Sequence, residues 1–65
     1  MKFNIYKFCT IIAEKEITLS ELSRQTKIDT ANLSRYKRGQ REPNLKNIGK
    51  IAKALGIDAA DLIEC

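Results

Sequence analysis

The chain has 65 residues, of which 43% are hydrophobic and 31% are charged, with a formal net charge of +4. This length allows a single domain over residues 1–65, and the composition is that of a folded globular protein rather than a disordered one. The chain contains no histidine, and its two cysteines, Cys9 and Cys65, lack metal-ligand spacing. The sequence therefore predicts no metal site, no cofactor and no enzymatic activity.

The N-terminal region contains no long apolar segment. Its longest apolar run is residues 11–13, which is too short for a signal peptide or a membrane span, and we therefore expect a cytoplasmic protein. In a reducing compartment no disulfide is expected. The register of Cys9 within the first predicted helix indicates a small buried hydrophobic residue.

Positive charge is concentrated in the middle of the chain. Residues 27–53 contain eight basic and two acidic residues, a net charge of +6, whereas the rest contains four basic and six acidic residues, a net charge of −2. This asymmetry predicts a polyanionic partner. For Lys50 and Lys53 a simpler interpretation is favoured, in which they solvate the outer face of a helix.

Capping residues and apolar spacing predict a first helix that begins after Asn4 and ends at about Lys15. Thr18 and Glu21 form a Thr-x-x-Glu capping box, which predicts a second helix over residues 19–26. Asp29 is a strong N-cap residue for a third helix over residues 30–37, which Gly39 would close with a positive φ.

Two further helices are predicted beyond Pro43. Asn44 can cap a helix that Gly56 ends, and Asp58 with Asp61 can cap a last short helix. No segment alternates long enough to predict a strand, so the fold class is all-α, with five helices. The helices would share one core, formed by Phe8, Ile12, Leu22, Ile28, Leu33, Tyr36, Leu45, Ile48, Ile51 and Leu55.

Two segments of the chain resemble the phage repressor and Cro family, also called the xenobiotic-response-element family. Residues 33–45, LSRYKRGQREPNL, are similar to the end of that family's recognition helix and the following loop, and residues 48–57 are similar to its fourth helix. The resemblance implies a compact five-helix, lambda-repressor-like domain whose second and third helices form a helix-turn-helix. The family usually has Gly in the turn between them, where this chain has Lys27, so this lysine must accept a positive φ or the turn must be built differently.

The resemblance places base-contacting side chains at the start of the third helix, which would enter the major groove of double-stranded DNA. Arg35 is the best candidate for a bidentate contact to guanine, with a phosphate contact or an idle surface position as the alternatives. Thr30 and Ala31 suit a thymine methyl group, but Thr30 can also be a simple first-turn residue and Ala31 a simple helix former. Asn32 can bond adenine, a phosphate or the first helical turn. The full base-contacting set is Thr30, Ala31, Asn32, Ser34 and Arg35.

A second group of residues is expected to contact phosphates, which sets register and affinity without reading sequence. This group consists of Thr18, Ser20, Arg38, Arg41 and Lys46. Thr18 has a capping role as its stronger alternative. Leu62 and Ile63 can supply a dimer contact, unless Leu62 only closes the core.

Together these features favour a sequence-specific transcriptional regulator of a prokaryote or phage. It is expected to act as a repressor by binding a pseudo-palindromic operator as a homodimer, without a membrane association or a small-molecule effector. The alternative is an antitoxin or adaptor that uses the same fold to bind another protein.

Overall fold

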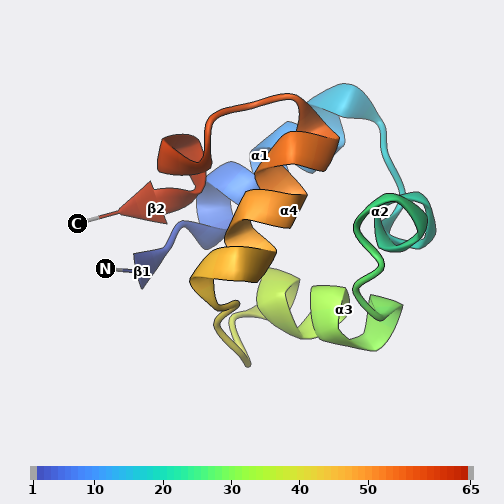
Figure 1. Cartoon of the computed structure of the whole chain (residues 1–65), viewed down its shortest axis with the longest axis horizontal. Helices are drawn as coiled ribbons and strands as arrows, with labels where there is room; N and C mark the ends of the chain where they lie inside the picture. Colours follow the sequence, from blue (N-terminus) through green and yellow to red (C-terminus); the bar gives the residue numbers. More distant parts are fainter. Residues whose placement is uncertain (1, 65) are drawn as a thin grey trace.

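The computed structural model describes residues 2–64, which form four α-helices, one short 3-10 helix and a two-stranded antiparallel sheet. The helices surround one core, and the first and last described segments, residues 2–3 and 63–64, pair on one side of the molecule (Figure 1). The elements in chain order are β1 (Lys2–Phe3), α1 (Ile5–Lys15), α2 (Leu19–Thr26), α3 (Thr30–Arg38), α4 (Leu45–Leu55), η1 (Ala59–Leu62) and β2 (Ile63–Glu64).

Side-chain caps fix the starts of three helices. Asn4 Oδ1 accepts from the backbone N–H of Lys7 at 2.9 Å, and Thr18 Oγ1 accepts from that of Glu21 at 3.1 Å. Asn44 Oδ1 accepts from that of Asn47 at 2.8 Å. Each bond satisfies an amide that has no partner within its helix, so α1, α2 and α4 begin where the sequence predicts.

The side-chain cap expected at Asp29 is not formed. Asp29 occupies the N-cap position of α3, but its side chain makes no capping hydrogen bond. A side-chain cap normally accompanies an extended backbone at the N-cap residue, and the other three α-helix caps have this conformation. The backbone of Asp29, at φ −55° and ψ 137°, departs from it. Only the backbone carbonyl of Asp29 contributes, accepting from Leu33 N at 3.0 Å.

Left-handed residues end the helices. Gly39 and Gly56 have φ values of 75° and 69°, as their positions after α3 and α4 predict. Lys27 ends α2 with a φ of 62°, so the turn keeps the geometry for which the family usually has Gly. A lysine in this region costs about 1 kcal/mol or more relative to glycine.

The core contains most of the residues that apolar spacing predicts, together with several that it does not. Tyr36 is among the confirmed residues, with 3% of its surface exposed. The prediction that Leu45 belongs to the core is wrong. As the first residue of α4, it projects beyond the core and is 60% exposed. Ile12 is only half-buried and Ile11 is buried instead, a rotation of α1 by one position. The buried hydrophobic residues are Phe3, Phe8, Ile11, Leu22, Ile28, Leu33, Tyr36, Ile48, Ile51, Ala52, Leu55 and Leu62.

The prediction of a fifth α-helix is also wrong. The segment after α4 forms one 3-10 turn, η1, and Asp58 makes no side-chain cap there. The chain then becomes extended at Ile63, and β2 pairs with β1 in the register Lys2↔Glu64 and Phe3↔Ile63. Leu62, with no exposed surface, closes the core, and its carbonyl accepts from Asn4 N at 2.7 Å.

Substituting alanine at Gly39 and at Gly49 is expected to change the free energy of unfolding in opposite directions. A Cβ at Gly39 would lie 2.9 Å from Ile5 Cδ1 and would need a positive φ, so Gly39→Ala should destabilise the fold by about 1–2 kcal/mol. Gly49→Ala should stabilise it by about 0.5–1 kcal/mol, because the added Cβ meets nothing within 4 Å inside a helix.

Urea unfolding of both variants measures this difference. Gly56→Ala is the matched control, since it has a positive φ but open space around the added Cβ. Equal stability of the Gly39 and Gly49 variants would contradict the left-handed helix end.

Candidate nucleic-acid interface

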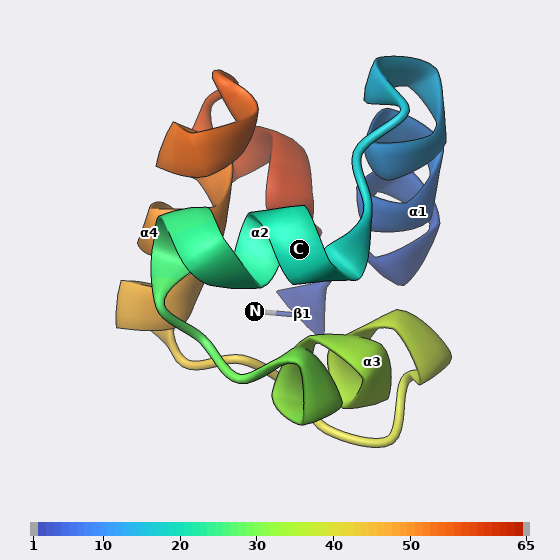
Figure 2. The same ribbon diagram turned by 90° about the vertical axis from the view of Figure 1, so that its right-hand side faces the viewer.

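Helix α3 is anchored through its inner face. Leu33 is fully buried, and Tyr36 packs with its ring 6.3 Å from that of Phe3. The Tyr36 hydroxyl accepts a hydrogen bond from Asn47 Nδ2 at 3.2 Å, which ties α3 to α4. Figure 2 shows α3 lying beneath α2, with a short turn joining them. The orientation of α3 is therefore set by the core and by both neighbouring helices.

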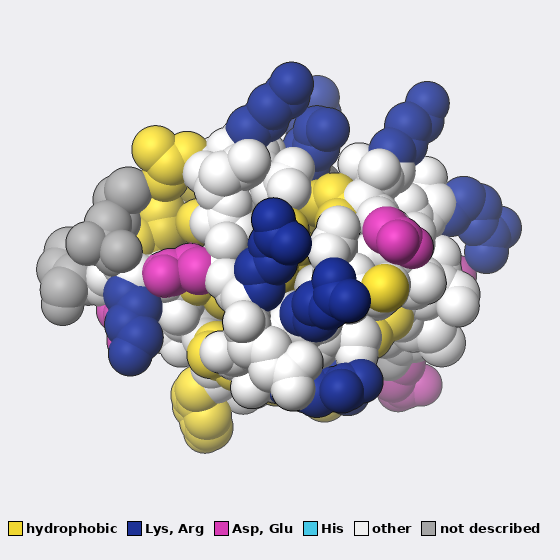
Figure 3. All heavy atoms as spheres, turned by 90° about the horizontal axis from the view of Figure 1, so that it is seen from below, with side chains coloured by type: hydrophobic (Ala, Val, Ile, Leu, Met, Phe, Trp, Pro, Cys, Tyr) yellow, Lys and Arg dark blue, Asp and Glu magenta, His cyan; other side chains and the backbone are white. Residues whose placement is uncertain are grey.

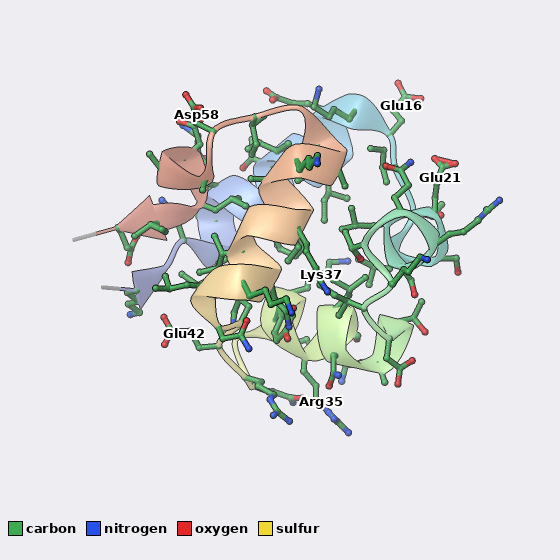
Figure 4. The ribbon with its side chains drawn as sticks, viewed as in Figure 1. Glu16, Glu21, Arg35, Lys37, Glu42 and Asp58 are labelled. Atoms are coloured by element: carbon green, nitrogen blue, oxygen red, sulfur yellow. The ribbon has the colours of Figure 1, made fainter. Side chains whose placement is uncertain are left out.

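The outer face of α3 presents small and basic side chains to solvent. Thr30, Ala31 and Arg35 are exposed, and Figure 4 shows Arg35 at the lower edge of the molecule, pointing away from it. Asn32 and Ser34 are half-buried. All five residues expected at the bases thus lie on this one short helix, at its N-terminal end and middle.

Asn32 and Ser34 hold the two arginines of α3 in position through hydrogen bonds. Arg35 Nη1 donates to Asn32 Oδ1 at 3.3 Å, and Arg38 Nη2 donates to Ser34 Oγ at 2.8 Å. Because these partners are neutral, they orient the guanidinium groups and leave the positive charge available to an anion. Sequence reasoning missed this positioning role, although the i, i+3 and i, i+4 spacings indicate it.

The residues expected at phosphates flank this face. Arg38, Arg41 and Lys46 are exposed, as are Thr18 and Ser20 at the start of α2. The Thr18 side chain caps α2, which was its stronger alternative role, and its hydroxyl proton remains available as a donor. Figure 3 shows Lys and Arg side chains distributed over this side of the molecule. In Figure 4, Glu16 and Asp58 lie at the opposite side of the molecule, whereas Glu42 lies in its lower half.

The loop after α3 is fastened to the N-terminus. Glu42 Oε1 accepts from the backbone N–H of Phe3 at 2.6 Å, and Pro43 is buried. This hydrogen bond joins residues 39 positions apart and holds the loop that carries Arg41. Nothing in the local sequence predicts this bond, because β1 is too short to show a strand pattern.

Other kinds of site have little support within residues 2–64. No group of three or more His, Cys, Asp or Glu side chains there could hold a metal ion, and no helix is long and apolar enough to span a membrane. Cys9 is half-buried rather than buried, with its Sγ 3.9 Å from the Lys37 carbonyl oxygen. Cys65 lies outside the described residues.

Two short helices joined by a three-residue turn, with a fixed second helix and an exposed polar and basic outer face, define a helix-turn-helix DNA-binding domain. The chain belongs to the family of Cro/C1-type HTH DNA-binding domains, whose family model matches residues 7–65. A comparison with curated protein sequences gave no significant match.

Solved structures agree with this assignment. The chain is similar to the restriction-modification controller protein C.AhdI from Aeromonas hydrophila, with 27% identity and a TM-score of 0.86 over 91% of this chain and 89% of that one. It is also similar to the clp gene regulator ClgR from Corynebacterium glutamicum. There the identity is 28% and the TM-score 0.82, over 88% of this chain and 61% of that one.

Proposed function

We propose that this chain is a sequence-specific regulator of transcription that represses by occupying its operator. The observation that carries the proposal is the outer face of α3, where exposed Thr30, Ala31 and Arg35 stand on a helix whose inner face is locked into the core. An α-helix of this kind fits the major groove, where each base pair presents a distinct pattern of donors and acceptors. The similar structures, a controller protein and a gene regulator, support a regulatory role.

In this proposal Arg35 reads a guanine, and Thr30 and Ala31 contact thymine methyl groups. Asn32 and Ser34 lie at the groove and hold the arginines in position. Arg38, Arg41, Lys46, Thr18 and Ser20 contact the phosphates on either side.

The operator would be bound by two copies of the chain, because one module of this size buries too little surface for high affinity. Leu62 cannot provide the dimer contact, since it has no exposed surface. Ile63 retains some exposure and lines a hollow of about 430 Å³ beside the exposed Leu45. Charges of both signs, on Lys2 and Glu42, also line this hollow and suit a self-complementary interface.

The salt dependence of DNA binding tests the phosphate contacts. Arg38→Ala should weaken binding to every duplex by a similar factor and reduce the slope of log K against log salt by about 1 for each bound subunit, because each subunit loses one phosphate contact. Fluorescence anisotropy with a labelled duplex at several salt concentrations measures both quantities. Arg24→Ala, which removes an exposed charge from α2, is the control and should leave the slope unchanged. An equal change in both variants would contradict a defined phosphate contact at Arg38.

A further inference from the structure

A second basic surface lies away from the outer face of α3. Lys50 and Lys53 lie three residues apart along α4, both are exposed, and α4 contains no acidic residue. The C-terminal half of α4 faces the end of α2, where Lys27 is also exposed. Between them is a hollow of about 360 Å³, lined by Gln25, Thr26, Lys27, Lys50, Lys53 and Ala54.

The buried polar side chain that lines this hollow already has its hydrogen-bond partners. Thr26 is buried, and its hydroxyl donates to the Leu22 carbonyl at 2.8 Å and accepts from Ile28 N at 3.2 Å. Lys27, Lys50 and Lys53 are instead exposed to solvent. Like charges three residues apart on a helix oppose helix formation slightly, so Lys50 and Lys53 do not stabilise α4 through each other.

Lys27 adds charge to the hollow at a conformational cost. Its φ of 62° is one that glycine adopts freely and a side chain does not. Glu16 has a similar φ of 54°, so such strain alone does not indicate a site. At Lys27, however, the strained residue brings a third ammonium group to a hollow that two other lysines already line.

The position of the hollow separates it from DNA in the proposed complex. Figure 2 shows the end of α2 against α4, with α3 below both. With α3 in the major groove, the junction of α2 and α4 lies to the side of the duplex contact. A stiff duplex presents its phosphates on a convex surface, whereas a flexible polypeptide can insert single carboxylate side chains into a hollow of this size.

We propose that Lys27, Lys50 and Lys53 form a docking surface for an acidic segment of another protein, which binds while α3 is on DNA. Charge complementarity selects the occupant: three cations rim the hollow, and acidic side chains carried on a flexible backbone can reach all of them. This goes beyond DNA binding and does not depend on which sequence α3 reads.

A decapeptide of glutamate serves as the probe, titrated into the ¹⁵N-labelled protein both alone and bound to a duplex. If the peptide binds at this surface, we expect changes in the amide chemical shifts of residues 25–27 and 50–54, and these changes should persist in the DNA complex. The double substitution Lys50→Gln with Lys53→Gln should weaken peptide binding roughly tenfold and leave DNA affinity within about twofold. The control, Lys7→Gln with Lys15→Gln on α1, makes the same change in net charge at exposed positions and should have little effect.

Three results would overturn the proposal: equal loss of peptide binding in both double variants, no binding by the unaltered protein, or a tenfold loss of DNA affinity in the Lys50 and Lys53 variant. The first would show attraction by net charge alone, and the last would assign the surface to DNA. Failure of α3 to bind any duplex would be a separate finding, because the peptide titration of the free protein can still be read.

Discussion

Arg35→Ala is expected to weaken binding to the preferred duplex by about 5-fold to 150-fold per half-site. This range corresponds to the roughly 1–3 kcal/mol of discrimination that a bidentate arginine–guanine contact provides. The side chain is exposed, and its only hydrogen bond within the described residues is the 3.3 Å contact with Asn32, so its removal should not disturb the fold.

The diagnostic feature of this variant is a change in specificity. Arg35→Ala should lose its preference at one base pair in each half-site, whereas Arg38→Ala should weaken all sequences alike. Competition binding with duplexes that carry single base-pair changes separates the two. A uniform loss for Arg35→Ala would reassign this residue to a phosphate. Unchanged affinity would leave it as an idle surface residue.

The largest effect on stability is expected at Leu62. Leu62→Ala should reduce the free energy of unfolding by about 2–5 kcal/mol, because it removes a fully buried side chain at the point where the two ends of the chain are joined. A domain of 65 residues has a total stability of only about 3–10 kcal/mol, so much of the variant could be unfolded at 37 °C.

Leu45→Ala is the matched substitution at an exposed leucine. It should change the stability of the monomer by no more than about 0.5 kcal/mol, because Leu45 is 60% exposed. If the hollow beside Leu45 and Ile63 is the dimer contact, this variant should also self-associate more weakly, so that its dimer dissociates at a higher protein concentration than the unaltered dimer. Urea unfolding and sedimentation equilibrium measure the two effects. Equal loss of stability in both variants would contradict the burial difference, and unchanged self-association of Leu45→Ala would contradict the proposed interface.

Local signals in the sequence predict the helices well. The α-helical bounds agree with prediction to within one residue, because Asn4, Thr18 and Asn44 act as caps and Gly39 and Gly56 accept a positive φ. These effects involve neighbours three or four residues apart, and such neighbours can be recognised without knowing the fold.

Features that join distant parts of the chain could not be predicted in this way. Phe3 lies in a two-residue strand with no periodicity, yet it is buried because β2 and Glu42 hold it in place. Leu45 fits the apolar stripe of α4 but lies at the first position of the helix, past the edge of the core. At the proposed DNA-binding surface, residue types favour α3 as the helix that contacts the bases. The pairing of Arg35 with Asn32 and of Arg38 with Ser34 emerges only from the side-chain conformations.

Selection of duplexes from a randomised library at near-physiological salt tests most directly whether α3 reads DNA sequence. The proposal predicts enrichment of an inverted repeat whose half-sites are about one helical turn apart, with a guanine in each half-site whose preference disappears in Arg35→Ala. Retention of duplexes without any sequence enrichment, with binding that falls steeply with salt, would contradict base reading by α3 and leave only an electrostatic association with DNA.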